Sequence, residues 1–141
     1  MNDYKDKELS LPQRKTRWSA GYDLAAAEEV TIPAGAVAVV PTGLKAYMEA
    51  DEVLMLHIRS SLALKQGLVL ANGTGIIDAD YVDNPDNEGH ILLAVYNRSR
   101  DPVTIRKGER VAQGIFVKYL CTDDDCPGGD RLGGFGSTGE T

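Results

Sequence analysis

Cysteine and histidine are scarce in this sequence, which limits the metal and disulfide chemistry open to it. The chain of 141 residues holds two histidines and two cysteines, Cys121 and Cys126. Two thiols with no histidine close by in sequence are too few for a structural zinc site. Nothing indicates a disulfide between them, which would require an oxidising compartment. We therefore expect both to be reduced surface thiols.

Long basic runs and long apolar runs are also absent. The net charge is −6 and no basic run is longer than a few residues, so double-stranded nucleic acid is not an expected partner. No N-terminal segment has the features of a signal peptide, and no apolar stretch approaches the length of a membrane span. The polar start from Met1 to Lys7 indicates a cytoplasmic protein with no membrane partner.

Short apolar runs separated by turn residues make up most of the chain. The length suits a single domain, and strands this short at this spacing predict an all-β sandwich or barrel. The expected strands are Glu29–Ile32, Ala36–Val40, Val53–Arg59, Leu68–Ala71, Ile91–Asn97, Val103–Ile105 and Val111–Tyr119.

The most apolar of these runs is Val53–Ile58, which we expect to be buried on both faces. His57 lies within it. Because histidine is typically of intermediate burial, we interpret His57 as a hydrogen-bonded core residue rather than a catalyst.

One short helix is expected from Ser60 to Gly67, with serine as N-cap and glycine as the C-terminal stop. Arg59 leaves a strand and runs directly into this helix. Arg59, Ser60 and Ser61 would then place a guanidinium and two hydroxyls at a helix N-terminus, which favours anions. The alternative is an ordinary capped helix with a solvent-facing arginine.

Two further segments carry polar groups next to apolar strands. Asp78 follows Gly75-Ile-Ile, where a strand should end, and Asp80 lies two residues on, on the same face. Paired carboxylates can bind metal or share acid and base roles, or they can be turn residues. Gln113 lies inside an apolar strand, where a buried amide needs partners from the core or from a ligand.

The C-terminal segment from Arg131 to Thr141 surrounds Phe135 with glycines. A bare backbone and hydroxyls can approach phosphates, an aromatic ring can stack on a base, and an arginine can neutralise charge. The alternative is a frayed terminus.

Taken in order, these segments resemble the five motifs of the homotrimeric dUTP pyrophosphatase (dUTPase) family, and the resemblance covers almost the whole chain. The matching segments are Ser19-Ala-Gly-Tyr-Asp23-Leu, Arg59-Ser-Ser-Leu-Ala63, Gly75-Ile-Ile-Asp78-Ala-Asp80-Tyr81, Gly108-Glu-Arg-Val-Ala-Gln113 and Gly133-Gly-Phe-Gly-Ser-Thr-Gly139.

The resemblance implies a jelly-roll-like β-sandwich, the dUTPase-like β-clip, assembled as a homotrimer with active sites between subunits. Residues 1–128 would form the β domain and residues 129–141 a flexible glycine-rich lid that folds over a neighbouring subunit. The implied reaction is hydrolysis of dUTP to dUMP and pyrophosphate, which limits uracil in DNA and supplies dUMP for dTMP synthesis.

The resemblance also implies roles for individual residues. Asp78 would be the general base that activates water for attack on the α-phosphorus, and it would also touch the sugar 3′-hydroxyl. Arg131 would be the second catalytic residue. Tyr81 would lie beneath the deoxyribose and exclude UTP. Mg²⁺ would be held mainly by the triphosphate, with Asp23 as an outer-shell contact through water. Uracil would be read by Asn72, Gly75, Ile76, Ile77 and Leu92; the phosphates would be held by Arg59, Ser60, Ser61 and Gln113; and the lid would consist of Arg131, Phe135, Gly136, Ser137 and Thr138.

Two departures from the family pattern stand out. Val82–Gly89 makes a longer hairpin tip than usual, and Arg131 lies four residues before Phe135 with Asp130 in the usual place of the arginine. The longer hairpin could bind a regulatory protein partner, so a dUTPase-like regulatory binding protein is an alternative. A more distant alternative is dCTP deaminase, which shares the fold and an Arg-Ser-Ser segment but needs a catalytic glutamate.

Overall fold

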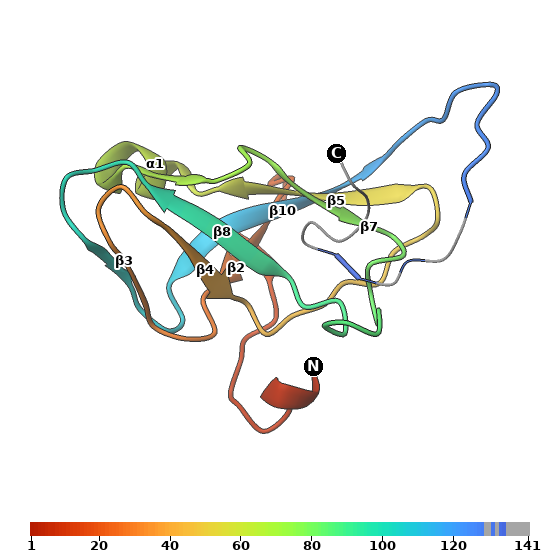
Figure 1. Ribbon diagram of the computed structural model, residues 1–141. Coiled ribbons are helices and arrows are strands. Elements are labelled where there is room, and N and C mark those ends of the chain that lie inside the picture. Colours follow the sequence, from red (N-terminus) through yellow and green to blue (C-terminus); the bar gives the residue numbers. More distant parts are fainter. Residues whose placement is uncertain (129–130, 132, 135–141) are drawn as a thin grey trace.

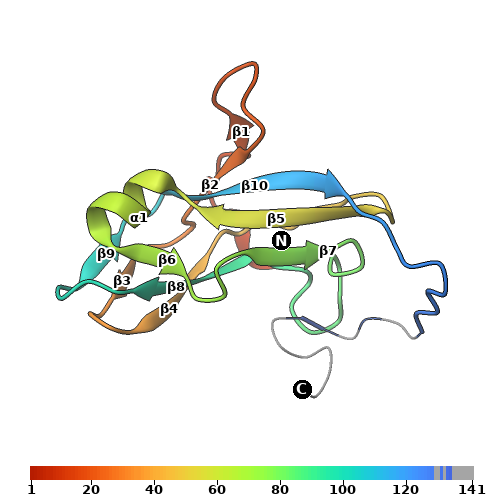
Figure 2. The same ribbon diagram turned by 90° about the horizontal axis from the view of Figure 1, so that it is seen from above.

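The computed structural model describes residues 1–128, 131, 133 and 134. Its strands form two facing layers (Figures 1 and 2). The larger layer is an antiparallel sheet in the order β1-β2-β10-β5-β7. Its strands are β1 (Gln13–Arg14), β2 (Tyr22–Ala25), β10 (Arg110–Lys118), β5 (Glu52–Ile58) and β7 (Gly75–Asp78).

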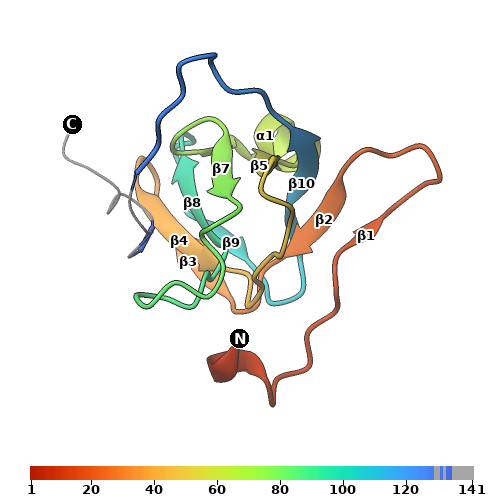
Figure 3. The same ribbon diagram turned by 90° about the vertical axis from the view of Figure 1, so that its right-hand side faces the viewer.

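The facing layer is a three-stranded antiparallel sheet in the order β4-β8-β6, together with the antiparallel pair β3 and β9. Figure 3 shows how the two layers enclose the interior. The one α-helix among the described residues, α1 (Ser60–Gln66), connects β5 of one layer to β6 of the other. The strands of this layer are β4 (Val37–Pro41), β8 (Leu92–Asn97), β6 (Leu68–Leu70), β3 (Val30–Ile32) and β9 (Val103–Ile105), and a 3-10 turn, η1 (Asn2–Tyr4), begins the chain.

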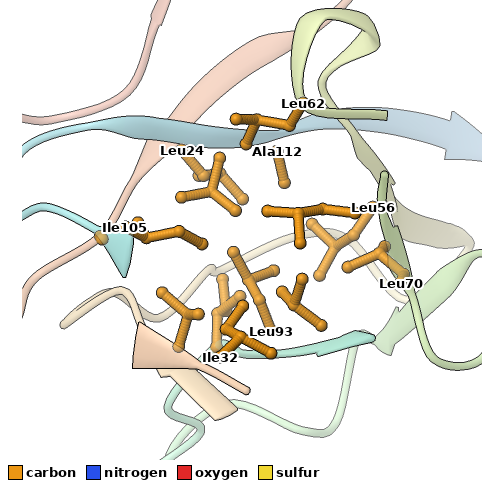
Figure 4. Close-up of a cluster of buried hydrophobic side chains, with 14 of the residues drawn as sticks. Leu24, Ile32, Leu56, Leu62, Leu70, Leu93, Ile105 and Ala112 are labelled. Atoms are coloured by element: carbon orange, nitrogen blue, oxygen red, sulfur yellow. The ribbon is translucent and has the colours of Figure 1, made fainter. Parts of the chain in front are cut away.

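The hydrophobic core lies between the two layers (Figure 4). Alternate residues of each strand point inward, because side chains alternate across a β-strand. The larger sheet contributes Leu24, Leu56 and Ala112, and the facing layer contributes Ile32 and Leu93. Helix α1 adds Leu62, whose burial fixes the helix against the end of the sandwich.

The expected all-β sandwich with one short helix is confirmed, and each expected strand is present within one or two residues of its expected bounds. Strands β1 and β2 were not expected. Both are short, and β1 is exposed throughout, so neither has the apolar run that marked the others. No helix among the described residues is long and apolar enough to cross a membrane.

The expectation that Val53–Ile58 is buried on both faces is wrong for the single chain. Leu54 and Leu56 are buried, whereas Met55 and His57 are only half-buried, in the alternating pattern of a strand with one face on the core. His57 points to that second face, and its side chain makes no hydrogen bond among the described residues. It is therefore not the hydrogen-bonded core histidine that we expected.

The helix has the expected extent but a different N-cap. Arg59, with an extended backbone, is the N-cap residue of α1, and no side chain caps the first turn. Ser60 is the first helical residue instead. At the other end Gly67 adopts the left-handed conformation with φ of 69° and donates its N–H to the Leu62 carbonyl, as expected for a glycine stop.

A buried asparagine ties the end of β8 to its surroundings. The Asn97 side chain has no exposed surface, and its Nδ2 donates to the carbonyls of Ile32 and Asp101 at 3.0 and 2.8 Å. Its Oδ1 accepts from the backbone N–H and the hydroxyl of Ser99 at 2.9 and 2.7 Å. All the polar atoms of this amide are thus used inside the protein.

Replacing Asn97 by alanine is expected to lower the free energy of unfolding by about 3 kcal/mol, because buried donors and acceptors lose their partners and a void remains. Chemical denaturation measures the change. The exposed Asn72 is the matched control, and its alanine variant is expected to change the stability by less than about 0.5 kcal/mol. Equal effects of the two substitutions would contradict this account.

Candidate active site

A cavity of about 250 Å³ lies between β7 of one layer and β8 of the other. It contains every described residue that was expected to read the base or touch the sugar. Those residues are Asn72, Gly75, Ile76, Ile77, Asp78, Tyr81 and Leu92, and Arg131 joins them from the C-terminal segment.

The cavity exists because two strand edges face each other without pairing. Among the described residues, β7 is the edge strand of its sheet and pairs with β5 alone. β6 pairs with β8 only from Asn97 to Val95, so Leu92 has no partner residue in β6. The backbone N–H and C=O groups along these edges are therefore open to a ligand that can form hydrogen bonds in a plane.

A carboxylate and a guanidinium meet in the lining of this cavity. Asp78 ends β7, as expected, and its Oδ2 accepts from Arg131 Nη2 at 2.5 Å. Arg131 Nε donates to Asp80 Oδ1 at 2.6 Å, and Nη1 donates to the Gly133 carbonyl at 2.9 Å. Partial burial lowers the pKa of the Arg131 guanidinium, but the bonds and charges of Asp80 and Asp78 outweigh this and raise it. The guanidinium is thus a permanent cation beside Asp78.

Tyr81 forms one wall of the cavity and is only 5% exposed. Its phenol donates to the His90 carbonyl at 2.7 Å and accepts from Asn87 Nδ2 at 2.8 Å. Burial raises the pKa of this phenol, although the bond from Asn87 and the charge of Arg131 oppose the shift. Tyr81 is therefore a neutral, fully bonded side chain at neutral pH.

The described part of the C-terminal segment lies on this chain's own cavity. The Arg131 guanidinium is 6.0 Å from the centre of the Tyr81 ring. Gly134 packs so closely on that ring that a Cβ atom there would overlap it, so only glycine fits. The resemblance implied a lid over a neighbouring subunit, whereas Arg131 lines the cavity of its own chain in this single-chain structure. Phe135, Gly136, Ser137 and Thr138 lie outside the described residues.

The residues expected to bind phosphates lie at the other end of the molecule. Asp78 pairs with Val53 at the start of β5, whereas Arg59 follows the end of that strand. Six residues of strand separate the two positions by roughly 20 Å. Figure 2 shows α1 and β7 at opposite ends. Arg59, Ser60, Ser61 and Gln113 are therefore not brought together with Asp78 in one chain.

Asp23 lies near this second group, because it pairs with Gln113 across β2 and β10. Its Oδ2 accepts from Arg110 Nη1 at 3.2 Å. Gln113 is half-buried and packs on Gly21, where a Cβ atom would approach its Oε1 to 2.5 Å. The described residues contain no group of three or more side chains suited to hold a metal ion.

Several lining residues were not expected from the sequence. Leu56, Leu70, Leu93 and Ala94 also line the cavity. Leu56, Leu70 and Leu93 belong to the buried core. Only the arrangement of the strands shows that they also reach the cavity. Asp80 was noted for its spacing from Asp78, but nothing in the sequence indicated that both carboxylates bind one arginine. Cys121 and Cys126 are free and exposed, as expected.

Comparison with known proteins identifies the family. The dUTPase family model matches residues 7–139. The chain is 51% identical over 138 residues to the deoxyuridine 5′-triphosphate nucleotidohydrolase of Lactococcus lactis, covering 96% of this chain and 92% of that protein. It is 41% identical to the enzyme of the same name from Escherichia coli, and the match covers 94% of this chain and 89% of that enzyme. The crystal structure of dUTPase from Streptococcus mutans matches with a TM-score of 0.83 and 51% sequence identity. The match covers 87% of this chain and 95% of the Streptococcus mutans chain. With its motifs, fold and cavity all in agreement, the chain belongs to the dUTPase family.

Proposed function

We propose that this protein hydrolyses dUTP to dUMP and pyrophosphate in a site built around the cavity between β7 and β8. The observation that carries the proposal is the position of Asp78, a carboxylate in the lining of a narrow cavity whose walls are two open strand edges. Such a cavity suits a flat polar ring, and the carboxylate lies where the rest of a nucleotide would emerge.

The base is selected by the open edges. Uracil presents a donor between two acceptors, and the backbone of Gly75–Ile77 and of Leu92 offers complementary groups along the cavity walls. Cytosine exchanges a donor and an acceptor and leaves buried groups unpaired, which is costly. Asn72 adds a side-chain amide at the same end. A methylated base is rejected by the close packing of the cavity.

The sugar is selected by Tyr81. Its ring is buried and fixed at the hydroxyl end by two hydrogen bonds, so it cannot yield to an additional 2′-hydroxyl. The deoxyribose would lie flat against this ring. UTP is excluded because its 2′-hydroxyl would meet an apolar surface that provides no partner.

Asp78 acts as the general base. It takes a proton from water, which attacks the α-phosphorus, and pyrophosphate leaves with the bridging oxygen. Arg131 forms an ion pair with Asp78 within this chain. When dUTP binds, the Arg131 side chain would turn toward the phosphates, which would leave the Asp78 carboxylate to bind water. The C-terminal segment 129–141 would close over the site with Arg131.

The phosphate-binding residues come from other subunits of a homotrimer. Arg59, Ser60, Ser61 and Gln113 are too far from Asp78 within one chain, but a neighbour can present them. A second cavity of about 380 Å³ supports assembly, because exposed apolar side chains surround it in the single chain. These include Leu11, Tyr22, Tyr47 and Phe116.

Mg²⁺ fits this arrangement as an ion held mainly by the triphosphate. Magnesium usually keeps several waters and binds through one or two carboxylates and phosphates, and Asp23 beside Gln113 offers one such carboxylate. The ion would supply charge neutralisation at the phosphates. Asp23 would hold one of its waters.

The proposal is tested with purified protein, magnesium and four nucleotides: dUTP, dTTP, dCTP and UTP. We expect pyrophosphate release from dUTP alone, because cytosine, the methyl group of thymine and the 2′-hydroxyl each conflict with a different wall. Comparable release from dTTP or UTP would contradict the assigned roles of the cavity walls or of Tyr81. Ammonia release from dCTP would instead support a deaminase.

We further propose a cytoplasmic location. The free thiols of Cys121 and Cys126 support a cytoplasmic location, since reduced cysteines are usual there. A regulatory protein partner at Val82–Gly89 has weaker support, because the buried Asn84 of that segment is directed inward, toward Tyr81.

A further inference from the structure

The segment Val82–Gly89, which follows Tyr81, is held from inside by two asparagines. Asn84 is only 6% exposed. Its Nδ2 donates to the Tyr81 carbonyl at 2.7 Å and to Asn87 Oδ1 at 2.8 Å. Its Oδ1 accepts the backbone N–H groups of Asp86 and Asn87 at 2.9 and 3.0 Å. A buried amide with all its partners specifies one conformation of the loop.

Asn87 links the ordered loop to the Tyr81 hydroxyl. Its Oδ1 accepts from Asn84 and from the Gly89 N–H at 3.1 Å, which fixes the plane of the amide. Its Nδ2 then donates to the Tyr81 hydroxyl at 2.8 Å. Since that hydroxyl donates to the His90 carbonyl, both of its hydrogen-bonding directions are set by the loop and its return strand.

The outer side of the loop is anchored to the rest of the molecule. Asp83 accepts from Lys45 Nζ at 2.5 Å and from the Tyr47 hydroxyl at 2.6 Å. Glu88 accepts from the backbone N–H of Asn2 at 3.2 Å. His90 Nε2 accepts from the Gly43 N–H at 2.9 Å. The loop is thus held at both ends, so the position of Asn87 is set by contacts within the chain.

We propose that Asn87 is a positioning residue that determines sugar specificity: its amide, oriented by Asn84, fixes the Tyr81 ring as the surface that excludes a 2′-hydroxyl. The inference rests on the proposed role of Tyr81 in dUTP hydrolysis. A ring held at its hydroxyl cannot tilt to admit a larger sugar, whereas a ring free at that end can. The long hairpin tip, Val82–Gly89, then serves to hold one wall of the substrate site in place.

The test compares kcat/KM for dUTP and for UTP. We expect Asn87→Ala to lower the ratio of the two values about fivefold, which corresponds to the loss of one hydrogen bond. Asn87→Asp keeps the acceptor for Asn84 and Gly89 but removes the donor to Tyr81, and we expect it to lower the ratio similarly. Asp86→Ala is the control, because this exposed side chain in the same loop makes no hydrogen bond among the described residues; it should leave the ratio unchanged.

A double-mutant cycle separates positioning from general loop stability. In a Tyr81→Phe background the hydroxyl is gone, so Asn87→Asp should change the ratio no further. A ratio that stays at the wild-type value in both Asn87 variants, or the same change in the Tyr81→Phe background, would overturn the proposal. A wild-type protein that does not prefer dUTP over UTP would instead overturn the proposed function of Tyr81 itself.

Discussion

Replacing Asp78 by asparagine is expected to lower kcat for dUTP about a thousandfold, the size of effect associated with a general base. Asp78 is the only carboxylate among the described residues that line the cavity. Asparagine has almost the same shape and can still face Arg131, but it cannot take a proton from water. Steady-state pyrophosphate release measures the loss, and calorimetry with dUMP tests whether the product still binds.

Asp80→Asn is the matched control for this substitution. Asp80 also pairs with Arg131, and its side chain is similarly exposed, but it does not line the cavity. We expect its variant to retain most of the wild-type kcat, with the change mainly in KM. An Asp80→Asn variant that loses more activity than Asp78→Asn would show that the base has been assigned to the wrong carboxylate.

Mixing two inactive variants is expected to restore activity. Asp78 and Arg59 lie at opposite ends of β5, so a complete site would combine Asp78 of one subunit with Arg59 of another. Pure Asp78→Asn and pure Arg59→Ala proteins should both be nearly inactive. After equal amounts are unfolded and refolded together, about a quarter of the sites should receive both native residues, because the two are drawn independently from different subunits of the assembly.

The control for complementation is a pair of residues from one cavity. Asp78 and Tyr81 line the same cavity of one chain, so every site in a mixture of Asp78→Asn and Tyr81→Ala carries one of the two defects. We expect no recovery from that mixture. Recovery of activity in the mixture of Asp78→Asn and Tyr81→Ala would refute a site divided between subunits in this way. So would a lack of recovery in the mixture of Asp78→Asn and Arg59→Ala, provided that native mass spectrometry shows mixed oligomers.

The sequence was most informative where the chain alternates between apolar runs and turn residues. Those runs predicted most strands, and Gly67 and Asp78 end their elements where expected. The family resemblance assigned Asn72, Tyr81 and Leu92 to one nucleotide site, and all three line one cavity. Strand ends and turns depend on local chemistry, so local sequence suffices to locate them.

What the sequence could not provide depends on contacts between distant segments. β2 has only four residues and gains its place from β10. Val53–Ile58 looks continuously apolar, but only alternate residues meet the core in one chain; the remainder can be covered only by something outside it. The inward orientation of Asn84 and Asn87 was equally hidden, since a run of asparagine, aspartate and proline is also typical of an exposed turn.

The open edge of β7 has a consequence for the solubility of the folded chain. Unpaired strand edges invite pairing with strands of other molecules, which leads to aggregation, and proteins usually keep such edges short or charged. β7 has four residues and ends at Asp78, with Asp80 and Arg131 beside it. Its free side faces β8 across a narrow cavity. The edge is therefore accessible to a small flat ring but protected from another polypeptide, which allows the protein to keep unpaired backbone groups without the usual risk.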